Sequence, residues 1–137
     1  MTGDFKFEYG LSTDLFVAPK PGGKSLVVGG MGEDHQRWTK VLSDRAAQLL
    51  WFQLVQQLYP ERAGQIKSAV MTAAMREADR PSVTTHVDVE PIEGQEAVQI
   101  AGYADRHPVW RVTINNEDAN QFLIALHNVL HPKNSSQ

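Results

Sequence analysis

Four cationic side chains and one indole ring fall within a single window of the sequence. The window holds Lys20, Lys24, Arg37, Trp38 and Lys40. Proteins that bind single-stranded nucleic acid combine cations that follow the phosphates with aromatic rings on which bases stack. The window therefore predicts a nucleic-acid-binding surface, although the carboxylates of Glu33 and Asp34 offset two of its four positive charges. The alternative is that Trp38, like Trp110 later in the chain, packs in the core.

Catalytic motifs are weak throughout the chain. Gly23-Lys24-Ser25 ends like a phosphate-binding loop, but Ala18 takes the place of the required earlier glycine, and a strand is expected to follow. The Glu33–His35 cluster is the best acid–base candidate, yet it lies in a glycine-rich turn, which is a poor scaffold for preorganised chemistry. Cysteine is absent, which excludes disulfides and thiol nucleophiles. We therefore expect that the protein is not an enzyme.

Two groups of side chains have spacings that suit metal ligands. His86, Asp88 and Glu90 share one face of an expected strand, and His127 and His131 lie one helical turn apart. The alternative is a solvated sheet face and histidines that interact with the negative end of a helix. We favour this alternative and predict neither a metal site nor another cofactor.

Length and composition suit one folded domain. The chain has 137 residues, of which 42% are hydrophobic, and its net charge of -3 shows no basic excess. No signal-peptide pattern is present, and the longest apolar run in an expected helix, Leu49–Phe52, is far too short to span a membrane. We expect a single domain over residues 1–132, a disordered polar tail over 133–137, a cytoplasmic location and no membrane contact.

The first half of the chain has the pattern of four strands and a helix. The expected strands cover residues 5–9, 15–17, 25–28 and 37–42, with turns at 10–14, 19–24 and 29–32. Ser43 suits a helix N-cap because its hydroxyl can accept a hydrogen bond from an unpaired backbone N–H. The helix should bury Leu50 and Leu54 and end at Tyr59-Pro60. Gln53, Gln56 and Gln57 would suit a partly exposed contact surface on this helix, but we favour a core helix.

The second half begins with an ambiguous segment. Residues 66–76 fit a helix, which their alanine content favours, or a strand of alternating side chains. Expected strands follow at 82–90, 97–103 and 109–114. Asn115 or Asn116 can cap a final helix whose buried stripe includes Phe122 and Leu126. The order of elements predicts an α+β fold: antiparallel sheets in two strand-rich halves, each followed by a helix.

With residues 66–76 taken as a strand, this order resembles the Whirly family, whose fold duplicates the unit of a single-stranded-DNA-binding transcriptional coactivator. Three stretches carry the resemblance. Residues 20–26, Lys-Pro-Gly-Gly-Lys-Ser-Leu, are similar to the family's Lys-Gly-Lys-Ala-Ala-Leu motif; residues 38–43 resemble its tryptophan-containing strand before the first helix; and residues 114–132 resemble its last strand and helix. The same order is similar to that of small cyanobacterial proteins of unknown function with this fold.

The resemblance implies a non-catalytic protein that binds single-stranded DNA or RNA, or acts in transcription, through the surface around Lys24 and Trp38. The alternative is a protein-interaction or assembly module without nucleic-acid binding, whose partner is another protein. The acidic balance and the interruption of the lysine motif by Pro21 and Gly22 favour that alternative. A duplicated fold can bury its own sheet edges as a monomer, whereas exposed edges would allow a homodimer.

Overall fold

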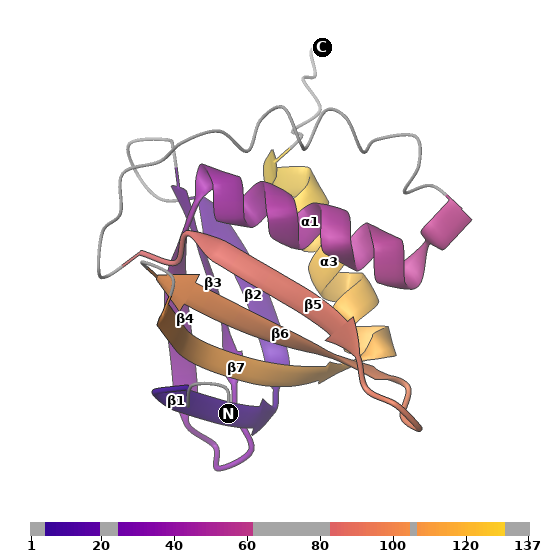
Figure 1. The fold of residues 1–137 in the computed structure, drawn as a ribbon, viewed down its shortest axis with the longest axis horizontal. Helices are drawn as coiled ribbons and strands as arrows, with labels where there is room; N and C mark the ends of the chain where they lie inside the picture. Colours follow the sequence, from indigo (N-terminus) through magenta and orange to yellow (C-terminus); the bar gives the residue numbers. More distant parts are fainter. Residues whose placement is uncertain (1–4, 20–24, 62–82, 105–106, 131–137) are drawn as a thin grey trace.

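Two strand-rich segments, each followed by a helix, make up the fold (Figure 1). The computed structural model describes residues 5–19, 25–61, 83–104 and 107–130. The named elements are β1 (Phe7–Leu11), β2 (Thr13–Pro19), β3 (Ser25–Met31), β4 (Arg37–Ser43), α1 (Asp44–Leu58), β5 (His86–Pro91), β6 (Ala97–Ala104), β7 (His107–Asn115) and α3 (Asn116–Leu130). The predicted α+β class is confirmed. The strand or helix expected at 66–76 and the tail at 133–137 lie outside the described residues.

The two sheets do not correspond to the two halves of the chain. β7, β6 and β5 pair antiparallel, and β1 joins them at the edge by pairing parallel to β7. β2, β3 and β4 form a separate antiparallel sheet. The prediction of antiparallel sheets therefore holds for these strands except at β1. Its parallel pairing places the first strand of the chain in the sheet of the second half.

A bend joins the two sheets, and the prediction of a turn over residues 10–14 is wrong. Ser12 alone separates β1 from β2, and its N–H donates to the Thr113 carbonyl at 2.8 Å. The bend uses left-handed backbone at Gly10, with φ of 69°, and at Asp14, with φ of 52°. Gly10 adopts this conformation without the steric cost that a side chain brings. One extended segment thus passes from the mixed sheet into the antiparallel sheet.

β3 continues through glycines that were expected to end it. Gly29 and Gly30 both lie inside β3 and are buried. A Cβ on Gly29 would lie 2.4 Å from a ring carbon of Phe16 and 2.7 Å from the Trp38 carbonyl oxygen. Glycine inside a strand often marks such a close approach. These glycines therefore let aromatic side chains pack against the sheet, and do not serve as a turn.

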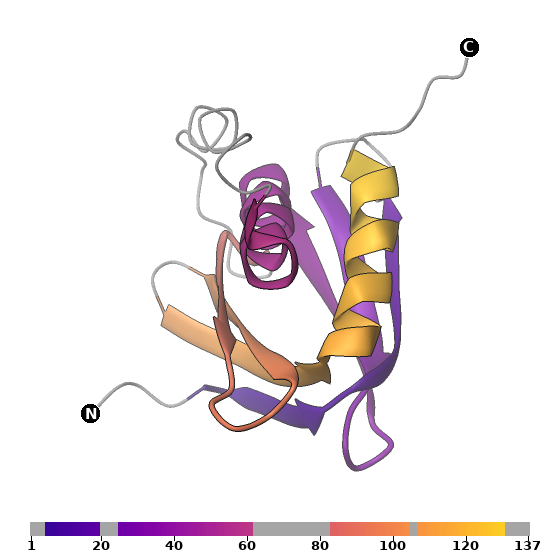
Figure 2. The same ribbon diagram turned by 90° about the vertical axis from the view of Figure 1, so that its right-hand side faces the viewer.

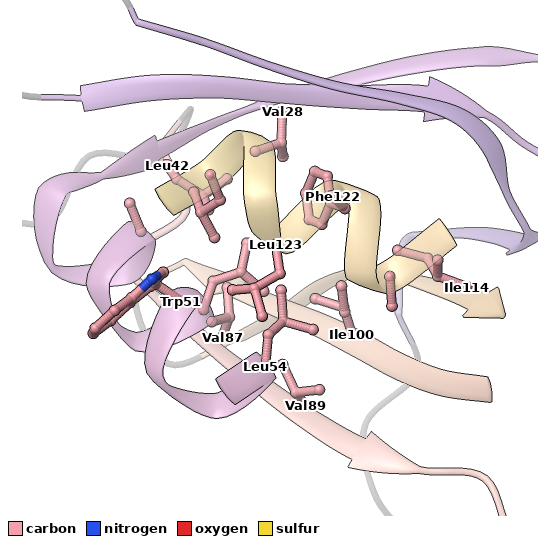
Figure 3. Close-up of a cluster of buried hydrophobic side chains, with 14 of the residues drawn as sticks. Val28, Leu42, Trp51, Leu54, Val87, Val89, Ile100, Ile114, Phe122 and Leu123 are labelled. Carbon is pink, nitrogen blue, oxygen red and sulfur yellow. The ribbon is translucent and has the colours of Figure 1, made fainter. Parts of the chain in front are cut away.

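Both helices lie in the angle between the two sheets (Figure 2). The Ser43 hydroxyl accepts the Ala46 N–H at 3.1 Å, which confirms the predicted N-cap of α1. At α3 the cap is Asn115, whose side-chain oxygen accepts the Asp118 N–H at 2.7 Å. α1 packs on β5, α3 packs on β2, and the two helices contact each other. Apolar side chains from both sheets and both helices fill the space between them (Figure 3). They include Val28, Leu42, Leu54, Val87, Ile100, Ile114, Phe122 and Leu123.

A side-chain amide of α1 covers the edge of β5 that pairs with no other strand in the described ranges. The Nε2 of Gln53 donates to the Val87 carbonyl at 2.8 Å, and its Oε1 accepts the Val89 N–H at 2.7 Å. The amide therefore takes the place of a neighbouring strand, and blocks an edge that could otherwise pair with another chain. Gln53 thus has an intramolecular role, as the favoured interpretation of a core helix implies.

Candidate nucleic-acid interface

Four aromatic side chains form a column where the two sheets meet. Phe7 stacks on Tyr9 with ring centroids 6.2 Å apart, Tyr9 on Trp38 at 5.4 Å, and Trp38 on Trp110 at 5.9 Å. The column comes from β1, β4 and β7, so both sheets contribute to it. The exposed fraction falls from 46% at Phe7 to 4% at Trp38 and 1% at Trp110. One end of the column therefore faces solvent, and the other end belongs to the core.

The buried end of this aromatic column is held by hydrogen bonds and close packing. The Trp38 Nε1 donates to the Ser12 hydroxyl at 3.1 Å, and the Trp110 Nε1 donates to the Thr84 hydroxyl at 2.8 Å. A Cβ on Gly102 would lie 2.2 Å from the Trp110 ring. Trp38 is thus a core residue, and its ring is covered in this conformation. Of the two interpretations of Trp38, core packing is confirmed, and the prediction that Trp38 itself offers an exposed stacking surface is corrected.

A cation lies over the exposed end of the column. The Lys40 ammonium is 4.3 Å from the ring centroid of Phe7 and 5.2 Å from that of Tyr9. These distances are within the range of cation–π attraction, which orients the ammonium over the rings. In the described part of the chain, no carboxylate lies within ion-pair distance of Lys40. The Lys40 charge is therefore held in place by aromatic rings without being neutralised by an acid.

The structure brings together only part of the predicted lysine and tryptophan window. Lys20 and Lys24 lie outside the described residues. Arg37 is exposed at the start of β4, opposite Met31 of β3. Because side chains alternate along a strand, Arg37 and Lys40 project from opposite faces of β4. Lys40 and Trp38 share the face that meets the aromatic column, and Arg37 does not.

Phe7 and Tyr9 are the site residues that the sequence reasoning missed. The alternation of aromatic residues at 5, 7 and 9 was a visible signal, but it indicated a half-buried strand. Their contact with Lys40 joins residues more than 30 positions apart. It depends on the crossing of the two sheets, which no local pattern predicts.

A second cation–aromatic pair involves residues beside β1. The Arg111 guanidinium lies 4.6 Å from the Phe5 ring centroid, and it forms an ion pair with Glu8 at 2.6 Å. Arg111 is therefore already neutralised by a carboxylate on the neighbouring strand. Only the Lys40 pair combines an exposed ring with an unneutralised cation among the residues described.

Several of the acid–base and metal candidates from the sequence have structural partners. The Glu33 N–H donates to the Tyr9 carbonyl at 2.9 Å, so its loop covers the edge of β1. The His86 Nε2 contacts the Asp88 carboxylate at 3.1 Å, and the Nδ1 of His127 accepts the Trp51 indole N–H at 3.1 Å. His131 lies outside the described residues. Across the described ranges, no three side chains of metal-ligating types gather at one point.

Comparison of the chain with protein-family models, with curated proteins and with solved structures finds no match. Within the described residues, neither helix has the length and apolar character needed to cross a bilayer.

Proposed function

We propose that this protein binds single-stranded nucleic acid, without catalysing a reaction, at the exposed end of the aromatic column. The observation that carries the proposal is the Lys40 ammonium held 4.3 Å from the ring centroid of Phe7, which is 46% exposed. A base can stack on an exposed aromatic ring while a phosphate pairs with a nearby cation. The resemblance in the order of elements to a single-strand-binding family supports the same function.

The charge distribution limits the expected contact to a few phosphates. The net charge is -3, and the outer face of the mixed sheet carries the carboxylates of Glu8, Asp88 and Glu90. A backbone that runs across that face would meet like charges, so the contact centres on Lys40. For single strands, the logarithm of the binding constant falls by about 0.7 per phosphate contact for each unit of log salt. We therefore expect a shallow salt dependence with a slope of about -1 to -2.

Titration of labelled single-stranded DNA and RNA, followed by fluorescence anisotropy, tests the proposal. Phe7→Ala should weaken binding by about 1–2 kcal/mol through the loss of base stacking. Lys40→Gln should weaken it and reduce the salt slope by about 0.7. Leu11→Ala is a matched control, because Leu11 is 43% exposed on the same strand and forms no contact with Lys40 among those described. Equal losses in Phe7→Ala and Leu11→Ala would argue against the site.

A protein-interaction module is the second candidate, and it also has a structural observation in its favour. Phe7 and Leu11 are large, exposed apolar side chains on the same strand, and Ile124 of α3 is 48% exposed. Exposed apolar groups can mark a surface on which another protein packs. This candidate predicts no oligonucleotide binding even at low salt, together with binding of a defined protein that Phe7→Ala weakens.

A further inference from the structure

A hollow of about 380 Å³ lies on the outer face of the mixed sheet, away from the aromatic column. It is lined by side chains of β5, β6 and β7 together with Phe5. This face of the sheet is turned away from both helices (Figure 2). The hollow is in the lower range of volumes that hold small molecules. Nothing in the proposed nucleic-acid contact uses it.

Two aromatic rings form one wall of this hollow. The rings of Phe5 and Tyr103 meet edge to face, with centroids 5.8 Å apart and an angle of 65° between their planes. The His86 ring, which is not part of the lining, packs against Tyr103 with ring centroids 5.7 Å apart. Ala101 lines the hollow beside Tyr103, and its small side chain leaves space that a longer one would fill. The hollow therefore has an aromatic wall and open room next to it.

Carboxylates dominate the charge around the hollow. Asp88 and Glu90 both line it, and both project from the same face of β5. Arg111 also lines it, but its guanidinium is paired with Glu8. Of the two carboxylates that line the hollow, Asp88 contacts the His86 ring. Glu90 has no cation within ion-pair distance in the described ranges. The hollow therefore has a negative potential beside two aromatic rings.

The pKa of the Tyr103 hydroxyl is affected by the same carboxylates. Burial raises the pKa of this phenol above its ordinary value, and the charges of Asp88 and Glu90 raise it further, while Arg111 acts in the opposite direction. The part of this shift that comes from Asp88 and Glu90 agrees with the negative charge that these carboxylates place beside the hydroxyl.

We propose that this hollow binds a small organic cation of the guanidinium or alkylammonium class. Carboxylates supply the opposite charge, and the Tyr103 ring supplies an aromatic surface of the kind that such cations prefer, while the Arg111 guanidinium already lies over the Phe5 ring. The Gln99 side chain, which also lines the hollow, offers an amide oxygen as a hydrogen-bond acceptor. Phosphates and other anions are repelled by the same groups. The site is independent of the nucleic-acid proposal.

Titration of the isotope-labelled protein with guanidinium probes, followed by two-dimensional amide NMR, tests this inference. Agmatine represents a free cation, and Nα-acetyl-arginine amide represents an arginine side chain presented by a protein. Nα-acetyl-citrulline amide has nearly the same shape without the charge, and is the control probe. We expect saturable shifts at Asp88, Ala101 and Tyr103 with one or both cations and none with the citrulline probe. The probe that binds more tightly identifies the source of the natural cation.

Two charge variants distinguish a specific binding site from general attraction of cations to an acidic protein. Glu90→Gln should weaken binding by about fivefold, the size of one partly exposed charge contact. Glu93→Gln removes the same charge from the exposed turn after β5, outside the lining, and should leave the affinity unchanged. Equal weakening in both variants would overturn the proposal. Absence of saturable shifts with either cation at 10 millimolar, about the weakest affinity expected of a specific small-ligand site, would also overturn it.

Discussion

The amide of Gln53 takes the place of a strand at the edge of β5, and its replacement by methionine removes that pairing alone. Methionine has a similar length and helix propensity, so α1 should remain intact in Gln53→Met. Two hydrogen bonds are lost, at 2.8 Å to the Val87 carbonyl and 2.7 Å from the Val89 N–H. Each is worth about 0.5–1.5 kcal/mol, so the free energy of unfolding should fall by about 1–3 kcal/mol.

Urea unfolding measures this loss, and Gln56→Met is the matched control. Gln56 lies on the exposed face of the same helix, so its replacement should change stability by less than about 0.5 kcal/mol. Amide hydrogen exchange gives a local measurement, because the Val89 N–H loses its acceptor and should exchange faster in Gln53→Met. Equal stability of the two variants, with unchanged exchange at Val89, would refute the claim that this amide covers the sheet edge.

Three further predictions concern the caps, the core and the outer face. Ser43→Ala should cost about 1 kcal/mol of stability in thermal unfolding, because the Ala46 N–H loses its capping acceptor. Gly102→Ala should cost about 1–3 kcal/mol and change the near-ultraviolet circular dichroism, since the new Cβ displaces the buried Trp110 ring. Tyr103 should titrate above pH 10.0 in carbon NMR, and Asp88→Asn should lower its pKa. Because folding raises the pKa of Tyr103, the stabilisation that comes from its protonated form is complete below pH 10.0. This stabilisation is lost as the pH rises through the raised pKa.

Local patterns in the sequence predicted most of the elements correctly, since each rests on neighbouring residues. The alternation that marked β5 is confirmed by its buried Val87 and Val89. The Ser43 cap is confirmed, and so is the end of α1 before Tyr59-Pro60, because capping and the proline restriction are local effects.

The sequence reasoning failed where distant residues decide the structure. Gly29 and Gly30 were expected to end β3, but they remain in the strand because Phe16 and Leu15 of β2 need their space. The parallel pairing of β1 with β7 joins two strands that lie far apart in the sequence, and no local signal encodes it. The same limit applies to the site, where Trp38 is buried by the crossing of the sheets.

That crossing also explains why Trp38 is buried while Phe7, on the neighbouring sheet, is exposed. The buried Trp38 stacks on Tyr9, and Tyr9 stacks on the exposed Phe7, so the column connects the core to the surface. A ring held in this way loses little conformational entropy when a base stacks on it. The fold thus places a preorganised aromatic surface next to Lys40.

The most direct test of the central claim is the anisotropy titration of labelled single-stranded DNA and RNA at low and moderate salt. We predict saturable binding to at least one of them, with a log–log salt slope of about -1 to -2 that becomes shallower by about 0.7 in Lys40→Gln. Phe7→Ala should weaken that binding, and Arg37→Gln, on the opposite face of β4, should not. No binding at low salt, or binding that Arg37→Gln weakens while Lys40→Gln does not, would contradict the account.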